Sequence, residues 1–156
     1  MKDKHKYTLK INWTGNLGVG TKDYAAYSRN YTISAKNKID ILASSDTIFT
    51  GDDNRHNPEE LFLASISSCH MLWYLHLCSD AGIRVTEYTD EPIGILSLNT
   101  NNGCFTSVTL NPVITITNIN QTDLAEILHT EANKKCFIAN SCNFTIHHFP
   151  TIKIKN

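Results

Sequence analysis

Two cysteines and a pair of glutamates are the residues of this chain whose types and spacing could do chemistry. Cys69 lies in the segment HNPEELFLASISSCHMLWYLH, residues 56–76, ten residues after Glu59, and Cys136 follows the segment TDLAEILHTEANKK. A cysteine in an apolar segment can be a small buried filler, a metal ligand or, as its thiolate, a nucleophile. A second cysteine on a buried helical face, together with the carboxylate pair, shifts the interpretation from filler toward nucleophile.

The number and spacing of the cysteines indicate the compartment and the kind of bond to expect. The chain has five cysteines, an odd number, and no C-x-x-C pair, which argues against a secreted disulfide framework and a zinc ribbon. The charged N-terminal segment MKDKHKYTLKIN has no apolar signal region, and no uninterrupted apolar run approaches the about 18 to 20 residues of a membrane span. We expect a cytoplasmic protein without a membrane segment, in which a disulfide would be transient and chemical in purpose.

Length and charge bound the organisation and the partners. With 156 residues and 41% hydrophobic composition, the chain can bury one substantial core, so we expect a single domain over residues 1–156. The 14 Lys and Arg residues nearly balance the 15 Asp and Glu residues. No basic face is implied, so nucleic acid is not an expected partner.

Two segments have the signals of helices, and both are associated with the cysteines. The first, Pro58 to Ala81, has Asn57 as its N-cap and Gly82 at its end, and it is apolar on so many sides that we expect it to be central and buried nearly all round. The second, residues 122–135, begins with Thr122 as its cap and delivers Cys136 on its buried face. The expected buried stripes are Leu61, Ser65, Ser68, Leu72 and Leu75 in the first helix, and Leu124, Ile127, Leu128 and Ala132 in the second.

The remaining periodic segments are typical of strands. Residues 6–13, 25–34 and 38–44 predict an antiparallel N-terminal sheet of about three strands. Further strands are expected at residues 83–89, 93–99, 105–117 with a bend at Pro112, and 144–155. The order of three strands, helix, strands, helix and strand predicts an α+β fold without internal repeats.

Helix geometry limits how the carboxylates can act on the first cysteine. Glu59 and Cys69 are ten residues apart, which places them about 80° apart around a straight helix and about 15 Å apart along it. They cannot touch on one helix. Any cooperation between them requires a partner element or another subunit.

The segment NPEELFLASISSCHMLWYLHLCSDAGI resembles the N-P-E-[EQ]-L…C helix signature of the OsmC/Ohr family, the osmotically inducible and organic hydroperoxide resistance proteins. LHTEANKKCFIANS resembles the second-cysteine segment of that family, and the order of elements agrees from residue 6 to the end. The resemblance implies an intertwined homodimer with antiparallel sheets wrapped around two central helices. It also implies two thiol-dependent peroxidase sites at the subunit interface, which reduce organic hydroperoxides to alcohols without a metal or another cofactor.

The resemblance assigns a role to each residue of the expected site. Cys69 would be the peroxidatic thiolate, Cys136 the resolving thiol that forms a disulfide with it, and Glu59 a carboxylate that helps to hold an activating arginine. An external dithiol, commonly a lipoylated protein in this family, would reduce the disulfide again. Burial alone raises the pKa of a thiol, so a guanidinium is needed to keep Cys69 ionised.

The position of the activating arginine departs from the family pattern. The family's two positions for it hold Leu17 and Ile48 in this chain. The available replacements are Arg29, in the segment YSRNYTI, and Arg55, in the loop before the first helix. We favour Arg29, because we expect it on a strand, and a strand fixes a side chain better than a loop does.

Two further observations leave alternatives open. His70 adjoins Cys69 but points about 100° away from it, so a buried structural histidine bound to a carbonyl or a carboxylate competes with a role as general base. The segments CFIANS and SSCHMLWYLH resemble the OsmC-like branch more than either named prototype. An apolar pocket lined by Phe62, Trp73 and Phe137 would favour alkyl or fatty-acid hydroperoxides, and the alternative function is a non-catalytic dimer that binds an apolar small ligand at its interface.

Overall fold

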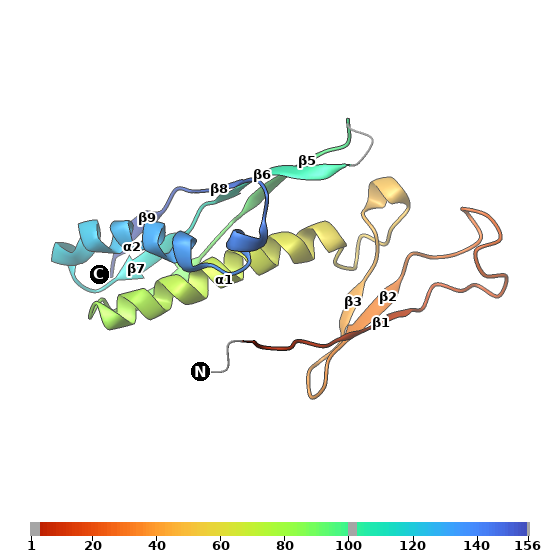
Figure 1. The fold of residues 1–156 in the computed structure, drawn as a ribbon, viewed down its shortest axis with the longest axis horizontal. Coiled ribbons are helices and arrows are strands. Elements are labelled where there is room, and N and C mark those ends of the chain that lie inside the picture. Colours follow the sequence, from red (N-terminus) through yellow and green to blue (C-terminus); the bar gives the residue numbers. More distant parts are fainter. Residues whose placement is uncertain (1–3, 100–102, 156) are drawn as a thin grey trace. The chain divides into compact units, whose positions relative to one another are not determined.

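The structure, a computed structural model, describes residues 4–99 and 103–155 (Figure 1). It is a mixed α+β fold with two long helices, which confirms the fold class predicted from the sequence. Contacts within the chain divide it at Leu61 into two compact units. The first unit holds the N-terminal sheet, and the second holds both cysteines of interest and all remaining strands.

The N-terminal unit contains the predicted three-stranded antiparallel sheet. Its strands are β1 (Lys10–Trp13), β2 (Tyr31–Ser34) and β3 (Ile41–Ala43), in the order β1-β2-β3. A 3₁₀ turn, η1 (Thr47–Phe49), follows β3. The expectation of a strand over residues 25–34 is wrong for its first half, because the chain there forms turns and β2 begins only at Tyr31.

The second unit contains two three-stranded sheets, and both are mixed. One has the order β4 (Val85–Thr89), β7 (Val113–Ile116), β9 (Thr151–Ile154), and the other has the order β5 (Ile93–Ser97), β6 (Cys104–Leu110), β8 (Thr145–His148). In each, the central strand pairs antiparallel with the earlier strand and parallel with the later one. The parallel pairs exist because the chain crosses over through a helix before it returns as β8 and β9. The antiparallel pairs agree with the expectation of antiparallel sheets, and each sheet of this unit adds one parallel pair to it.

Two prolines divide what the sequence suggests are continuous strands. Pro112 separates β6 from β7, as the expected bend, and Pro150 separates β8 from β9, where one strand was expected. A proline has no N–H to donate to a sheet. Backbone bonds resume at once on either side, from Phe149 N to the Leu110 oxygen at 3.0 Å and from Thr151 N to the Pro112 oxygen at 2.8 Å.

The long helix α1 (Pro58–Asp80) begins and ends as its sequence predicts. The Asn57 side chain accepts from the Glu60 N–H at 2.8 Å, and the Glu60 carboxylate accepts from the Asn57 N–H at 3.2 Å, which is a capping box. Gly82 has φ +70°, a left-handed conformation that suits a glycine after a helix.

The second helix, α2 (Thr122–Lys135), has the predicted bounds but a different start. A 3₁₀ turn, η2 (Ile119–Gln121), runs directly into it, and the Thr122 hydroxyl donates to the Ile119 carbonyl instead of capping α2. Cys136 is the C-cap of α2 and is fully buried, as expected.

The faces that the two helices bury agree only in part with the predicted stripes, since Ala132 is buried as expected but most of the other predicted residues are not. In α1 the buried row is Ile66, His70, Tyr74 and Cys78, whereas Leu72, on the expected stripe, is 63% exposed. In α2 the buried row is Ala125, His129 and Ala132, whereas Leu124 and Ile127 are exposed. Helices that are apolar on several sides do not reveal by periodicity which side the chain itself will cover. The prediction that α1 is buried nearly all round is wrong for the single chain.

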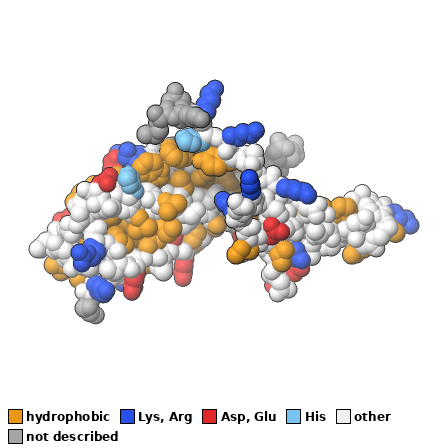
Figure 2. Space-filling model, turned by 90° about the horizontal axis from the view of Figure 1, so that it is seen from below, with side chains coloured by type: hydrophobic (Ala, Val, Ile, Leu, Met, Phe, Trp, Pro, Cys, Tyr) orange, Lys and Arg blue, Asp and Glu red, His pale blue; other side chains and the backbone are white. Residues whose placement is uncertain are grey.

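The uncovered apolar surface of α1 is extensive. Figure 2 shows hydrophobic side chains gathered on the visible face of the molecule, and the exposed apolar residues of the second unit include Leu72, Ile127 and Phe137. By length and hydropathy, α1 would even be long and apolar enough to cross a membrane, although core helices of soluble proteins pass the same test.

The buried row of α1 joins two hydrophobic clusters. Ile66 packs with Val108, Leu110 and Ile146, all from the sheet that contains β6. About two and three turns further along, Tyr74 and Cys78 pack with β7 and with α2 through Ile114, Ile116, Ala125 and Ala132. Cys69 therefore lies in the middle of α1, between the residues that anchor it to the two sheets.

Candidate active site

The structure brings the sulfurs of Cys69 and Cys136 together in the second unit. Cys69 comes from the middle of α1 and is half-buried, and Cys136 comes from the end of α2 and is fully buried. Both are free thiols, and Cys69 lies close enough to Cys136 to raise the pKa of the Cys136 thiol. Because α1 and α2 share a core, the proximity of the sulfurs is set by helix packing rather than by a loop.

The environment of Cys136 favours the protonated form of its thiol. Burial and the neighbouring Cys69 raise the pKa of Cys136 to about 12, and the backbone N–H of Ala139, 3.3 Å from the Cys136 sulfur, acts against this rise. The two cysteines therefore differ in their surroundings: Cys136 is a buried thiol whose protonated form is favoured, and Cys69 beside it is half-buried.

Aromatic side chains adjoin the two cysteines. Trp73 lies one turn after Cys69, and Phe137 follows Cys136; their rings meet edge to face with centroids 5.6 Å apart. Along the same side of α1, Leu72, Trp73 and His76 line a shallow hollow of about 320 Å³. Phe62, which was expected in the same pocket, instead packs on Phe105 with centroids 5.1 Å apart.

Glu59 and Arg29 belong to the N-terminal unit. Glu59 is half-buried, its Oε2 atom has no hydrogen-bond partner among the described residues, and its charge, after burial, raises the pKa of Tyr31. Arg29 lies two residues before β2 and not on a strand. Its guanidinium stands over the ring of Tyr24 at 4.0 Å and donates to the backbone oxygens of Tyr24 and Tyr27 at 2.7 and 2.6 Å. The reason for preferring Arg29, its place on a strand, is therefore removed.

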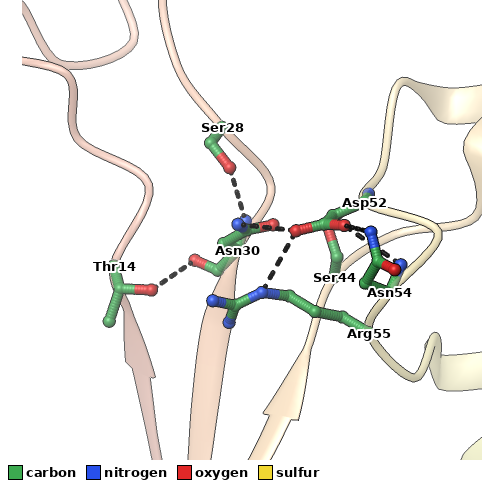
Figure 3. A network of polar contacts seen from close by, with 7 residues as sticks. All are labelled: Thr14, Ser28, Asn30, Ser44, Asp52, Asn54 and Arg55. Atoms are coloured by element: carbon green, nitrogen blue, oxygen red, sulfur yellow. Dashed lines mark hydrogen bonds and ion pairs between the residues drawn. The ribbon is translucent and has the colours of Figure 1, made fainter.

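Arg55, the alternative cation, is held in a polar network of the same unit (Figure 3). Its Nε lies 3.3 Å from Asp52 Oδ2, and the Asn30 side chain donates to the same carboxylate oxygen at 3.3 Å. The Asn54 backbone N–H donates to the other oxygen at 3.0 Å and is the first cause that holds the pKa of Asp52 below its usual value. Arg55 Nη1 is buried and has no hydrogen-bond partner among the described residues. Arg55 thus has an unused donor, as Glu59 has an unused acceptor.

Sequence reasoning missed a group of histidines in the second unit. His70 is buried, as expected, but its partner is neither a carbonyl nor a carboxylate: His70 Nε2 lies 3.0 Å from His129 Nδ1. The ring of His148, from β8, is 5.7 Å from that of His70. His129 follows Ala125 by one turn on the buried row of α2, which was the available signal, but the expected stripe lay on a different face. His76 is instead exposed, 3.5 Å from Asp80.

Comparisons with known proteins agree on one family. The family model described as OsmC-like protein matches residues 51–148. A solved OsmC-like protein of unknown function from Vibrio cholerae is 28% identical, with a TM-score of 0.86 over 94% of this chain and 99% of that chain. The comparison with curated proteins gives no match.

More distant solved structures have the same fold. An organic hydroperoxide resistance protein from Elizabethkingia anophelis is 21% identical, with a TM-score of 0.67 over 97% of this chain and 99% of that chain. An organic hydroperoxide resistance protein from Legionella pneumophila is 19% identical, with a TM-score of 0.64 over 96% of this chain and 99% of that chain.

Proposed function

Because the chain belongs to the OsmC-like protein family, we propose that it is a thiol-dependent peroxidase that reduces organic hydroperoxides to alcohols. The observation that carries the proposal is the contact between Cys69 and Cys136. A disulfide between two residues requires their sulfurs to meet, and the effect of Cys69 on the pKa of Cys136 supports their being neighbours in the reduced protein. The names of the two hydroperoxide resistance proteins with this fold support a peroxide-related role.

The proposed reaction uses the two thiols in sequence. The Cys69 thiolate attacks the O–O bond of the hydroperoxide, so that a sulfenic acid forms on Cys69 and the alkoxide leaves as the alcohol after taking up one proton. The Cys136 thiol then attacks the sulfenic sulfur, a disulfide forms, and the hydroxyl leaves as water with the proton of Cys136. An external dithiol, such as a lipoylated protein, reduces the disulfide and supplies the two electrons and two protons.

Activation of Cys69 requires a positive charge, and Arg55 is the better-supported source. Each unit by which a thiol pKa falls corresponds to about 1.4 kcal/mol of preferential stabilisation of the thiolate. The buried, unpartnered Nη1 of Arg55 can donate to an arriving anion, whereas the guanidinium of Arg29 is engaged by Tyr24 and Tyr27. We propose that Glu59, with its free oxygen, orients this cation.

The proposed active form is a homodimer. Glu59 and Cys69 are too far apart on α1 to act on each other within one helix. The exposed apolar residues of α1 and α2 support burial against a second copy of the chain, which would bring the Glu59 and Arg55 of one copy to the Cys69 of the other. We place this dimer in the cytoplasm, where reducing conditions keep such thiols ready to react.

The apolar surface beside the cysteines supports organic rather than hydrogen peroxide as the substrate. Trp73 and Phe137 can pack against the hydrocarbon part of an alkyl or fatty-acid hydroperoxide, while hydrogen peroxide offers nothing to bury there. The same surface supports the second candidate, a dimer that binds an apolar ligand without turnover. The two positions at which the family carries its activating arginine hold Leu17 and Ile48 in this chain, and this difference favours the binding alternative.

Stopped-flow mixing of the reduced protein with cumene hydroperoxide tests the proposal. We expect two thiols per chain to be lost in the parent, one in Cys136→Ser, which stops at the sulfenic acid, and none at a comparable rate in Cys69→Ser. Consumption of the hydroperoxide by Cys69→Ser at the parent rate would refute the enzyme. Binding of cumyl alcohol without any thiol loss in the parent would establish the binding alternative.

A further inference from the structure

Two buried imidazoles connect α1 to α2, and the proposed reaction gives them no part. His70 is 1% exposed and His129 is 0% exposed, and their contact at 3.0 Å joins Nε2 of the first to Nδ1 of the second. The ring planes differ by only 11° and the centroids are 5.3 Å apart. With the nitrogens in hydrogen-bond contact, these values describe rings that lie edge to edge in nearly one plane rather than face to face.

The surroundings hold this pair in place without a charged partner. Tyr74, one turn after His70, stacks on the His129 ring with centroids 3.8 Å apart, and His148 lies on another side, 6.3 Å from His129. Burial is the main cause that lowers the pKa of both histidines, followed by the ring of His148 and, for His129, by His70 itself. Neutral imidazoles are joined by one N–H donor and one lone pair, so the contact is a directional N–H···N bond.

The same two helices also bring Cys69 close to Cys136, near enough to raise the pKa of the Cys136 thiol. On α1 the two contacting residues, Cys69 and His70, are neighbours whose side chains leave the helix about 100° apart. On α2 their partners, His129 and Cys136, are seven residues apart, which is about two turns and therefore on one face. The two contacts start from adjacent residues of α1 and reach residues of α2 that are about two turns apart. Together they restrict how α2 can rotate about its own axis and how it can shift along that axis.

Apolar packing alone does not fix the rotation and the axial position of α2 so closely. The other buried residues of α2 are Ala125 and Ala132, whose small side chains make non-directional contacts. We propose that the hydrogen bond between His70 and His129 is a positioning device that holds Cys136 against Cys69. The biological role of this hydrogen bond rests on the proposed function. The reactivity of the Cys69 and Cys136 thiols toward each other, however, can be measured without a hydroperoxide.

Equilibration with glutathione measures how readily Cys69 and Cys136 form a disulfide with each other, independently of any peroxidase reaction. One oxidised glutathione accepts two electrons from the thiols of Cys69 and Cys136, a disulfide forms between the two cysteines, and the two protons end on the two reduced glutathione molecules. The equilibrium constant of this exchange reports how closely the folded chain holds the two sulfurs. It is measured by mass spectrometry after acid quenching over a series of glutathione ratios.

The test compares two replacements of one histidine. His129→Leu removes the hydrogen bond, and we expect the equilibrium constant to fall about tenfold, the usual effect of one neutral hydrogen bond. His129→Gln can still donate to or accept from His70, and should stay within about threefold of the parent. His148→Leu is the matched control, because the His148 ring borders the pair but makes no hydrogen bond with it among the described residues. An unchanged constant in His129→Leu, or an equal fall in His148→Leu, would overturn the proposal.

Further measurements keep the test decisive if His129→Leu does not fold. The double variant His70→Leu/His129→Leu leaves no orphaned nitrogen of the pair and should fold while showing the same fall in the constant. In the unaltered reduced protein, ¹⁵N NMR of the imidazoles should show one slowly exchanging N–H in the shared bond. Rapid exchange of all ring protons with solvent would show that the bond does not persist, and would overturn the proposal even if the peroxidase reaction is real.

Discussion

At the residue scale, the two cysteines of the candidate site are not equivalent. Burial and the neighbouring Cys69 raise the pKa of Cys136 to about 12, so Cys136 remains a thiol at neutral pH, while Cys69 is only half-buried. A resolving thiol that stays protonated cannot compete with its partner for the hydroperoxide. The asymmetry therefore supports the order of attack in which Cys69 reacts first.

Arg55 is the proposed source of the positive charge that activates Cys69, and its replacement should slow the reaction of Cys69. We expect Arg55→Ala to lower the second-order rate of the reaction of Cys69 with cumene hydroperoxide by about ten- to a hundredfold, because the variant removes the positive charge proposed to stabilise the thiolate, and each tenfold change corresponds to about 1.4 kcal/mol. The pH dependence of Cys69 alkylation by iodoacetamide should shift upward in the same variant. Both quantities are measured in a Cys136→Ser background, where Cys69 cannot form a disulfide with Cys136.

Arg29→Ala is the matched control for this prediction. Its guanidinium stacks on Tyr24 and Tyr27, so we expect a loss of stability in the N-terminal unit and a rate within about threefold of the parent. If instead Arg29→Ala lowers the rate strongly and Arg55→Ala does not, the role returns to Arg29.

At the scale of elements, local signals predicted the helices well. Asn57, Glu60 and Gly82 act through contacts within a few residues, so α1 ends within one residue of its predicted bounds, and α2 has the predicted bounds. The split at Pro150 was missed although its signal is equally local. The spacing of the apolar residues could not show which face of each helix the rest of the chain buries, because both helices are apolar on more than one side.

The same limit applies to the candidate site. The family signature selected Cys69 and Cys136 before the structure showed their contact. His129 escaped notice, and His148 gave no signal of a shared site, because each acquires its significance from residues far away in the sequence. Arg29 was preferred because it was expected on a strand, and the actual start of β2 at Tyr31 removes that argument. Long-range neighbours are set by packing, and a single sequence does not display them.

The exposed side of α1, which includes Leu72, is proposed to lie in the dimer interface, and a charge placed there should weaken the dimer. Leu72 is 63% exposed in the single chain, so Leu72→Lys should leave the fold intact while placing an unpaired charge in the proposed dimer interface. We expect the dimer dissociation constant to rise by about a hundredfold, in line with the several-kcal/mol cost of such a buried charge. Sedimentation equilibrium measures it. Ser79→Lys, near the end of α1 and exposed, is the control, and an unchanged mass distribution in Leu72→Lys would exclude α1 from the interface.

At the scale of the whole molecule, the buried histidines link folding to pH. The pKa of His70 is lowered to about 4 and that of His129 to about 3, mainly by burial, from the 6.5 that they regain on unfolding. Below pH 6.5 the unfolded chain binds protons that the folded chain does not, so stability is complete above pH 6.5 and falls as the pH decreases toward 4. Each histidine should remove about 2 kcal/mol of unfolding free energy between pH 6.5 and 5.

Urea denaturation at fixed protein concentration, at pH 7.5, 6.5, 5.5 and 5.0, measures this loss. A constant concentration is necessary because dissociation of a dimer would otherwise contribute to the apparent stability. Carboxylates such as Asp52, whose pKa lies below its usual value of 3.8, titrate below this range and do not account for a change within it. In His70→Leu/His129→Leu the decline should largely disappear, leaving the smaller contribution of the less buried His148, whose pKa is also lowered by burial. A decline of the same size in that variant would mean that the acid sensitivity of the protein arises elsewhere.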